Sequence, residues 1–449
     1  MEVQIFSKKL IKPSVPTPSH LRNMRLSLMD NRLPPATMAI IFYYTAYGGN
    51  NHQNVEQKLK RLEKSLSEIL TLYYPLARRY VKETLSINCK DDGVEYAQAL
   101  VNGQLSQILQ GQFHESKEPN RFVPHHQEEE SATNPLVAIQ INIFNCGGLA
   151  IGLRTSHRIV DAVTCSLFTN GWAKACKEGH INDVIVPNFQ LLGERRKHRD
   201  TNIYVLPSPS KTIISEVVTR RFVFDAKTIS KVMEAEDNKL KFSTAVVIAL
   251  IWRAQINAAR ARNGGFLRPS LLSGAVNLRG KTFRKISENC CGNIYTLGTA
   301  RFQADKSKMR LDNFVDQVRD AITNTIAEFG TQKEDHEDGF FSKLMMRPYI
   351  ELAEEIKKGE GDVHKFSSLR NFPLYEVDFG WGKPAWVSFA QRPYKGVMLI
   401  DTKSGDGVEA WVTMDEEEMN YFQNDPTIRI SVVDEDGIPE RFPIFRSKI

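Results

Sequence analysis

The sequence predicts an α/β fold with two domains of similar size, each a mixed sheet covered by helices. Stretches with the two-residue alternation of strands and stretches with helical apolar spacing follow one another along the chain. The chain has 449 residues, which is enough for two large domains. Periodicity is lost from about 180 to 215, where Pro, Ser and charged residues accumulate. We therefore expect an N-terminal domain over 1–190, a crossover loop over 191–215 and a C-terminal domain over 216–449.

The composition is typical of a soluble globular protein, with 41% apolar and 25% charged residues. The net charge of +6 is mild and the charges of both signs are interspersed, so no nucleic-acid partner is expected. The longest apolar run is too short to span a bilayer, and the N-terminus has no apolar signal region. None of the six cysteines forms a CxxC pair, which predicts free thiols. We expect a cytoplasmic monomer without a membrane partner.

The N-terminal half shows the expected alternation of elements. A buried strand is predicted over 38–47, and an amphipathic helix over 55–73 has an apolar face that needs only a core. Short strands are predicted over 85–89 and 94–101. A hairpin over 136–156 follows, and its second strand leads directly into a helical pattern.

The C-terminal half continues in the same way. A strand over 221–225 is followed by a strongly apolar helix over 243–259, with Ser243 as a candidate N-cap. A strand over 273–279 ends in polar residues. Two further helices and a pair of strands are expected over 312–328, 341–358, 396–401 and 407–412.

His157 is the candidate catalytic residue, because it stands where the strand pattern changes to a helical one. Imidazole is readily a free base near neutral pH, so it can take a proton from an alcohol. Asp161 follows four residues later. By itself this spacing is more typical of a structural histidine hydrogen-bonded to a carboxylate. A metal site on the same pair is a third interpretation, but no second His or Cys pair completes a ligand set.

The second notable stretch, Asp378-Phe379-Gly380-Trp381-Gly382, precedes Lys383 and Pro384. Two glycines around a tryptophan, followed by proline, predict a fixed turn whose backbone N–H groups Asp378 can bind. The phosphate-binding patterns GxGxxG and GxxxxGK[ST] and the nucleophile pattern GxSxG do not occur. Their absence argues against nicotinamide chemistry, ATP hydrolysis and an α/β-hydrolase mechanism.

HxxxD at 157–161 and DFGWG at 378–382, in this order and spacing, resemble the plant BAHD acyltransferases. The opening LIKPSVPTPSHL, RFVFD at 221–225 and DTKSGDGVEAW at 401–411 are similar to the vinorine-synthase-like group of that family. The resemblance covers nearly the whole chain. It implies a fold like chloramphenicol acetyltransferase, with a channel between the domains, and transfer of an acyl group from coenzyme A to an alcohol or amine. Within that group the donor is mostly acetyl-CoA and the acceptor an alkaloid or terpenoid alcohol.

The resemblance also implies roles for individual residues. His157 would be the general base in a direct ternary complex, and Arg279 would pair with Asp161 as a structural ion pair. Asn277 belongs to the matching N-L-R stretch, and it is a candidate coenzyme contact together with Ser243 at its helix N-terminus. Acyl-CoA would be a co-substrate, with no permanently bound cofactor and no metal. Structural roles are implied for Asp378, Gly380, Trp381 and Gly382.

One departure and two alternatives remain. Arg78 stands where the family has glycine, and it would strain the turn if that glycine has a positive φ. One alternative is an enzyme of the same family with a longer acyl donor or an amine acceptor. The other is a catalytically silent relative that acts as a binding protein.

Overall fold

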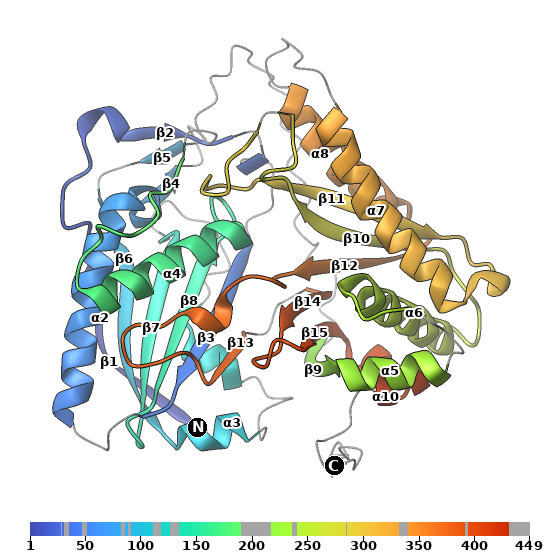
Figure 1. The fold of residues 1–449 in the computed structure, drawn as a ribbon, viewed down its shortest axis with the longest axis horizontal. Coiled ribbons are helices and arrows are strands. Elements are labelled where there is room, and N and C mark those ends of the chain that lie inside the picture. Colours follow the sequence, from blue (N-terminus) through green and yellow to red (C-terminus); the bar gives the residue numbers. More distant parts are fainter. Residues whose placement is uncertain are drawn as a thin grey trace.

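A computed structural model describes residues 1–27, 29–30, 36–46, 52–81, 86–88, 91–110, 118–125, 134–189, 217–235, 240–283, 285–331, 340–390 and 394–430. It confirms the α/β class: two six-stranded sheets lie side by side, each with helices packed on it (Figure 1). Both sheets combine parallel and antiparallel pairs. The crossover predicted over 191–215 lies outside the described residues, so that domain boundary stays a prediction.

The first sheet has the strand order β1-β6-β7-β8-β3-β13. The strands are Glu2–Ile11 (β1), Val94–Asn102 (β6), Val137–Phe144 (β7), Leu149–Ser156 (β8), Thr37–Tyr44 (β3) and Trp386–Phe389 (β13). β3 is buried on both faces, as its continuous apolar run predicts. β13 comes from the C-terminal half and pairs antiparallel with β3. The two halves of the chain are therefore joined within one sheet.

Two long helices, α2 (His52–Leu72) and α4 (Ala162–Glu178), lie side by side on this sheet (Figure 1). The apolar face of α2 is fully buried at Leu62 and Leu66. Trp172 of α4 is also fully buried and donates through Nε1 to the carbonyl of Leu62 at 3.2 Å. This contact fixes α4, the helix that follows His157, against α2.

The second sheet has the order β11-β10-β12-β14-β15-β9. Its strands are Tyr295–Phe302 (β11), Ser270–Asn277 (β10), Asp362–Ser368 (β12), Gly396–Asp401 (β14), Gly407–Asp415 (β15) and Val217–Asp225 (β9). The helices of this half are Ala226–Ala235 (α5), Thr244–Arg262 (α6), Leu311–Thr331 (α7), Phe340–Lys358 (α8), Glu416–Gln423 (α9) and Pro426–Ile430 (α10). α6 is buried over most of its length, in agreement with its apolar sequence.

Short elements complete the fold. A three-stranded sheet has the order β2-β5-β4, formed by Asn23–Arg25, Ser86–Asn88 and Arg79–Val81. A short helix, α3, covers Leu105–Leu109. The 3-10 segments are Ser19–Leu21, Tyr74–Ala77, Glu118–Phe122, Lys306–Lys308 and Leu374–Glu376. Within the described ranges, no helix is both long and apolar enough to cross a membrane.

The core of the first sheet extends into the C-terminal half. Val377, Phe379, Met398 and Trp411 belong to the same buried cluster as the side chains of β3, β8, α2 and α4. A separate cluster fills the space between the second sheet and α6. The halves thus share apolar contacts as well as a strand.

Arg78 does not strain its turn, which corrects the concern raised by the sequence. Its φ of −126° and ψ of −177° are ordinary extended values that any residue adopts. The side chain is fully buried, lies over the ring of Tyr74 at 4.3 Å and donates to the carbonyl of Leu21 at 3.2 Å. Arginine is therefore used here for packing and for its cation–π contact.

We expect Arg78→Gly to lower the free energy of unfolding by about 1–3 kcal/mol, because it removes the buried cation–π contact and a hydrogen bond. Urea unfolding followed by fluorescence measures this. Lys403→Gly, in the exposed turn before β15, is the matched control for backbone entropy and should change stability by about 1 kcal/mol or less. A more stable Arg78→Gly protein would show that the arginine strains the turn after all.

Candidate active site

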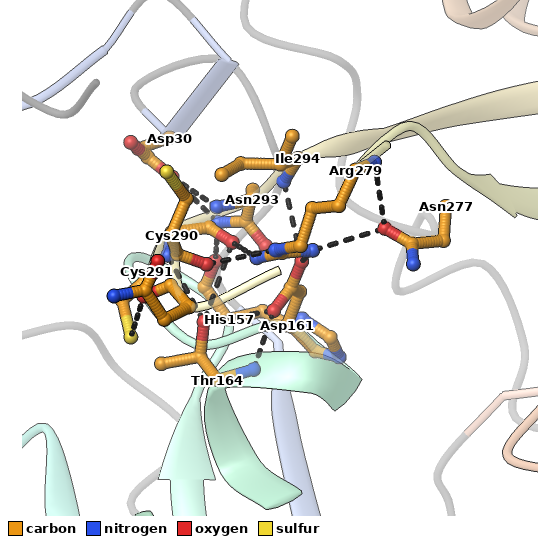
Figure 2. A network of polar contacts seen from close by, with 12 residues as sticks. Asp30, His157, Asp161, Thr164, Asn277, Arg279, Cys290, Cys291, Asn293 and Ile294 are labelled. Atoms are coloured by element: carbon orange, nitrogen blue, oxygen red, sulfur yellow. Dashed lines mark hydrogen bonds and ion pairs between the residues drawn. The ribbon is translucent and has the colours of Figure 1, made fainter. Parts of the chain in front are cut away.

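His157 lies in the turn between β8 and α4, as the sequence predicts. Its backbone N–H donates to the carbonyl of Ala36 at 2.8 Å, and its own carbonyl accepts from Asn293 Nδ2 at 2.6 Å. The residue is half-buried, and Nδ1 of its imidazole is buried. The turn is thus held by hydrogen bonds from both halves of the chain, and Figure 2 shows His157 beside its partner Asn293.

Asp161 is the N-cap of α4, and both of its carboxylate oxygens are engaged. Oδ1 accepts from the backbone N–H and the hydroxyl of Thr164, each at 2.8 Å. Oδ2 accepts from Arg279 Nη1 at 2.7 Å and from the backbone N–H of Ile294 at 3.2 Å. Donors from the protein therefore occupy both oxygens of this carboxylate. This arrangement favours the structural role implied by the resemblance.

Arg279 follows β10, and its guanidinium has no solvent exposure. Besides Asp161, it donates to the carbonyls of Cys290 at 2.7 Å and Gly292 at 3.1 Å. The ion pair therefore joins the start of α4 to the segment 290–294 that precedes β11 (Figure 2). All three guanidinium nitrogens thus donate hydrogen bonds, which offset the desolvation of a buried ion pair.

Asn277, a candidate coenzyme contact, lies at the end of β10 beside Arg279. Its side-chain oxygen accepts from Arg279 Nη1 at 3.1 Å and from the Arg279 backbone N–H at 3.2 Å. Through these two hydrogen bonds, the Asn277 oxygen orients Arg279 toward Asp161. A coenzyme contact of Asn277 stays a prediction, and it would have to come from the amide nitrogen.

Asp30 and Asn293 form a buried polar pair beside His157 that the sequence did not suggest. Asp30 Oδ1 accepts from Asn293 Nδ2 at 2.7 Å, and Oδ2 accepts from the Ser27 hydroxyl at 2.5 Å. Burial raises the pKa of Asp30 to about 6, against hydrogen bonds that lower it. Neither spacing nor periodicity indicated that these residues meet.

Asp378 closes the DFGWG turn. Its Oδ1 accepts from the backbone N–H groups of Gly380 at 2.8 Å and Gly382 at 2.9 Å, and Oδ2 accepts from Lys177 Nζ at 2.8 Å. Burial alone would raise the pKa of Asp378, but these hydrogen bonds outweigh it and leave the pKa below its usual value. The two glycines have φ of 102° and 104°, values that L side chains rarely adopt.

Trp381 packs this turn onto α2. Lys58 Nζ lies 5.5 Å and the Arg61 guanidinium carbon 6.0 Å from its ring centre, and Phe379 stacks beside it. Lys177, which binds the turn, is at the C-terminal end of α4, whereas His157 precedes the N-terminal end. The 17-residue helix spans roughly 25 Å. The motif is therefore remote from His157, as expected of a structural turn.

Ser243 caps α6, with its hydroxyl accepting from the backbone N–H of Val246 at 3.4 Å. Arg370 lies at the same helix end and donates to the Thr244 hydroxyl at 3.0 Å and to Asp401 at 2.7 Å. The sequence did not point to Arg370. A helix N-terminus with an adjacent guanidinium suits an anionic group, although Asp401 offsets part of the arginine charge.

The metal interpretation of His157 gains no support from the surrounding ligands. Both oxygens of Asp161 are committed to hydrogen bonds. Within the described residues, the potential ligands that cluster in a group of three are Glu178, His180 and Asp183, which are exposed at and just beyond the C-terminal end of α4. The described cysteines are free thiols: Cys146, Cys165, Cys176, Cys290 and Cys291.

Asp161→Ala should lower the free energy of unfolding by about 3–5 kcal/mol, because it leaves the Arg279 guanidinium buried without its partner. Urea unfolding measures the loss. Ser243→Ala is the matched control, since it removes only the N-cap of a long helix and should cost about 1 kcal/mol. Equal losses in the two variants would mean that the Asp161–Arg279 ion pair adds no stability beyond the N-cap that Asp161 provides.

Asp30 should make stability depend on pH. Its folded pKa of about 6 lies above the ordinary aspartate value of 3.8, so the folded protein binds the extra proton between these values. Stability then falls as pH rises, by about 1.4 kcal/mol per unit, and is constant above pH 6. Asp30→Asn removes this ionisation, so the stability difference between wild type and variant isolates it. Unfolding measured from pH 4.5 to 8 tests this, and a pH-independent difference would contradict it.

Comparisons with known proteins agree with this arrangement. The model of the family described as Transferase family matches residues 1–428. The chain is 34% identical to acetyl-CoA-benzylalcohol acetyltransferase of Clarkia breweri, over 94% of this chain and 98% of that protein. Stemmadenine O-acetyltransferase of Catharanthus roseus is 33% identical, with coverage of 94% and 97%.

Among solved structures, the crystal structure of vinorine synthase superposes with a TM-score of 0.77 at 31% identity, over 94% of this chain and 96% of that one. The similarity in sequence and fold thus extends over both halves. The chain is an acyl-CoA-dependent acyltransferase and belongs to the Transferase family of BAHD acyltransferases.

Proposed function

We propose that this enzyme transfers the acetyl group of acetyl-CoA to a hydroxyl of a plant specialised metabolite, an alkaloid or terpenoid alcohol. The observation that carries the proposal is the placement of His157 in a turn held by Ala36, Asn293 and the Asp161–Arg279 pair. The two named plant relatives are acetyltransferases, and both names specify an oxygen acceptor. This supports an O-acetyl transfer here.

His157 acts as general base in this proposal. Because Nδ1 is buried, we assign Nε2 as the nitrogen that meets the acceptor hydroxyl. The imidazole takes the hydroxyl proton while the oxygen attacks the thioester carbonyl, which gives a tetrahedral intermediate. The carbon–sulfur bond then breaks, and the imidazolium gives its proton to the leaving thiolate. The products are the acetyl ester and coenzyme A, with both substrates bound at once.

The coenzyme would be held in part at the N-terminus of α6. Ser243 already occupies the N–H of Val246, so a phosphate there would bind the remaining N–H groups of the first turn and the guanidinium of Arg370. Asn277, on the strand that leads to Arg279, is the second proposed contact.

We further propose that the protein is a cytoplasmic monomer with a domain boundary over 191–215. Size-exclusion chromatography tests the monomer, and limited proteolysis tests the boundary.

The deciding experiment combines thermal melting with turnover, for wild type and His157→Ala. Acetyl-CoA at about 100 times its dissociation constant should stabilise both proteins by roughly 2.7 kcal/mol. Turnover with acetyl-CoA and a panel of alcohols, beginning with benzyl alcohol, should fall by about 10² to 10⁴ in the variant. His180→Ala, an exposed histidine beyond the end of α4, is the matched control and should retain activity.

Full activity of His157→Ala would disprove the general-base role. Faster turnover with malonyl-CoA would change the proposed donor, and faster turnover with benzylamine would change the proposed acceptor class. Neither result would contradict the general-base mechanism. The absence of any melting shift with acyl-CoA, together with no turnover, would favour the catalytically silent relative.

A further inference from the structure

Asp30 is a buried carboxylate to which the proposed mechanism gives no role. Its side chain is fully buried and accepts from the backbone N–H and side chain of Asn293, at 3.2 and 2.7 Å, and from the N–H and hydroxyl of Ser27. Its neighbour Met29 packs into a cluster that otherwise belongs to the C-terminal half. Asp30 therefore lies in the seam between the two halves, close to the turn of His157 (Figure 2).

The amide of Asn293 connects Asp30 to His157. Its Nδ2 donates to Asp30 Oδ1 at 2.7 Å and to the carbonyl of His157 at 2.6 Å. An amide nitrogen carries two hydrogens, so each acceptor takes one and the donors are used up. With both hydrogens directed, the amide plane is fixed. The carbonyl of His157 is then held in place on one side, while its N–H is held by Ala36 on the other.

Burying a carboxylate costs free energy, and this cost points to a role for Asp30 beyond packing. A neutral side chain of the same shape would avoid the desolvation that Asp30 bears. A carboxylate, however, can only accept, so it forces Asn293 to present its nitrogen rather than its oxygen. With its oxygen turned inward, Asn293 would face the carbonyl of His157 with a second acceptor. The charge thus selects the amide orientation that supports the turn.

We propose that Asp30 is a positioning residue for His157 and acts through the amide of Asn293. The inference rests on the proposed role of His157 as the general base. Loss of the carboxylate frees the amide to rotate, which loosens the carbonyl of His157 and lets its imidazole leave the orientation needed for proton transfer. Misplacement of a reacting group by about 1 Å can cost 100-fold in rate, so a small loosening has a measurable effect.

The test measures the freedom of the His157 ring without any substrate. Deuterium exchange at Cε1, resolved by peptide mass spectrometry, is compared in wild type, Asp30→Ala, Asn293→Ala and the double variant. We expect the plateau exchange rate of His157 to rise at least fivefold in each single variant. The double variant should show no further rise, because both changes break one chain of contacts. Asp30→Asn, which keeps the shape, should give an intermediate effect and serves if Asp30→Ala does not fold.

Two controls separate positioning from general loosening. Asp425 is also buried and accepts from Asn257 Nδ2 at 2.9 Å and from the N–H and hydroxyl of Thr427, far along the chain from His157. Asp425→Ala should leave the exchange of His157 within twofold of wild type. His364 on β12 is the internal reference, whose exchange should be unchanged in all variants.

With the acceptor found in the turnover assay, Asp30→Ala should lower kcat at least tenfold and change KM for acetyl-CoA less than twofold. Unchanged exchange of His157 in folded Asp30→Ala and Asn293→Ala would overturn the inference, and so would an equal rise at His364. Faster exchange of His157 in a protein that shows no transfer activity would uphold the positioning and instead refute the proposed function. The two failures are thus distinguishable.

Discussion

The buried ion pair between Asp161 and Arg279 is the interaction on which the site depends. It joins residues 118 positions apart at 2.7 Å, with no solvent exposure of the guanidinium. Such a pair needs further hydrogen bonds to offset its desolvation, and here two carbonyls, the side-chain oxygen of Asn277, Thr164 and Ile294 provide them. It therefore fixes the start of α4 and the segment before β11 as one unit.

The C-terminal half holds α4 at both ends. Arg279 binds the N-cap carboxylate, and Asp378 of the DFGWG turn binds Lys177 in the last turn. An acid at the N-terminus and a base at the C-terminus also match the helix dipole, so each contact stabilises the helix as well as the seam. The two sequence motifs thus act on opposite ends of one helix.

The sequence predicted elements whose burial pattern is regular, and it failed where burial is slight or the register is interrupted. β3, β8, α2 and α6 follow from apolar runs or helical spacing. β1 was missed, because it is a largely exposed edge strand and its register shifts between Ile5 and Ser7. The concern about Arg78 was wrong for a related reason. The glycine of the family is not needed for a positive φ at this position, because the backbone of Arg78 is extended and leads directly into β4.

Among the polar contacts of the site, the sequence predicted only those that the resemblance to the family implied. It implied the contact of Asp161 with Arg279, whereas the coenzyme interpretation of Asn277 overlooked the bonds of its oxygen to Arg279. Asp30 and Asn293 are 263 residues apart, and no periodicity relates them. What identifies them is the inventory of hydrogen bonds in the folded chain. Asn293 has two hydrogens on one nitrogen, and one of its two acceptors is the backbone carbonyl of His157. A buried acid that sets this orientation can therefore influence catalysis without touching a substrate.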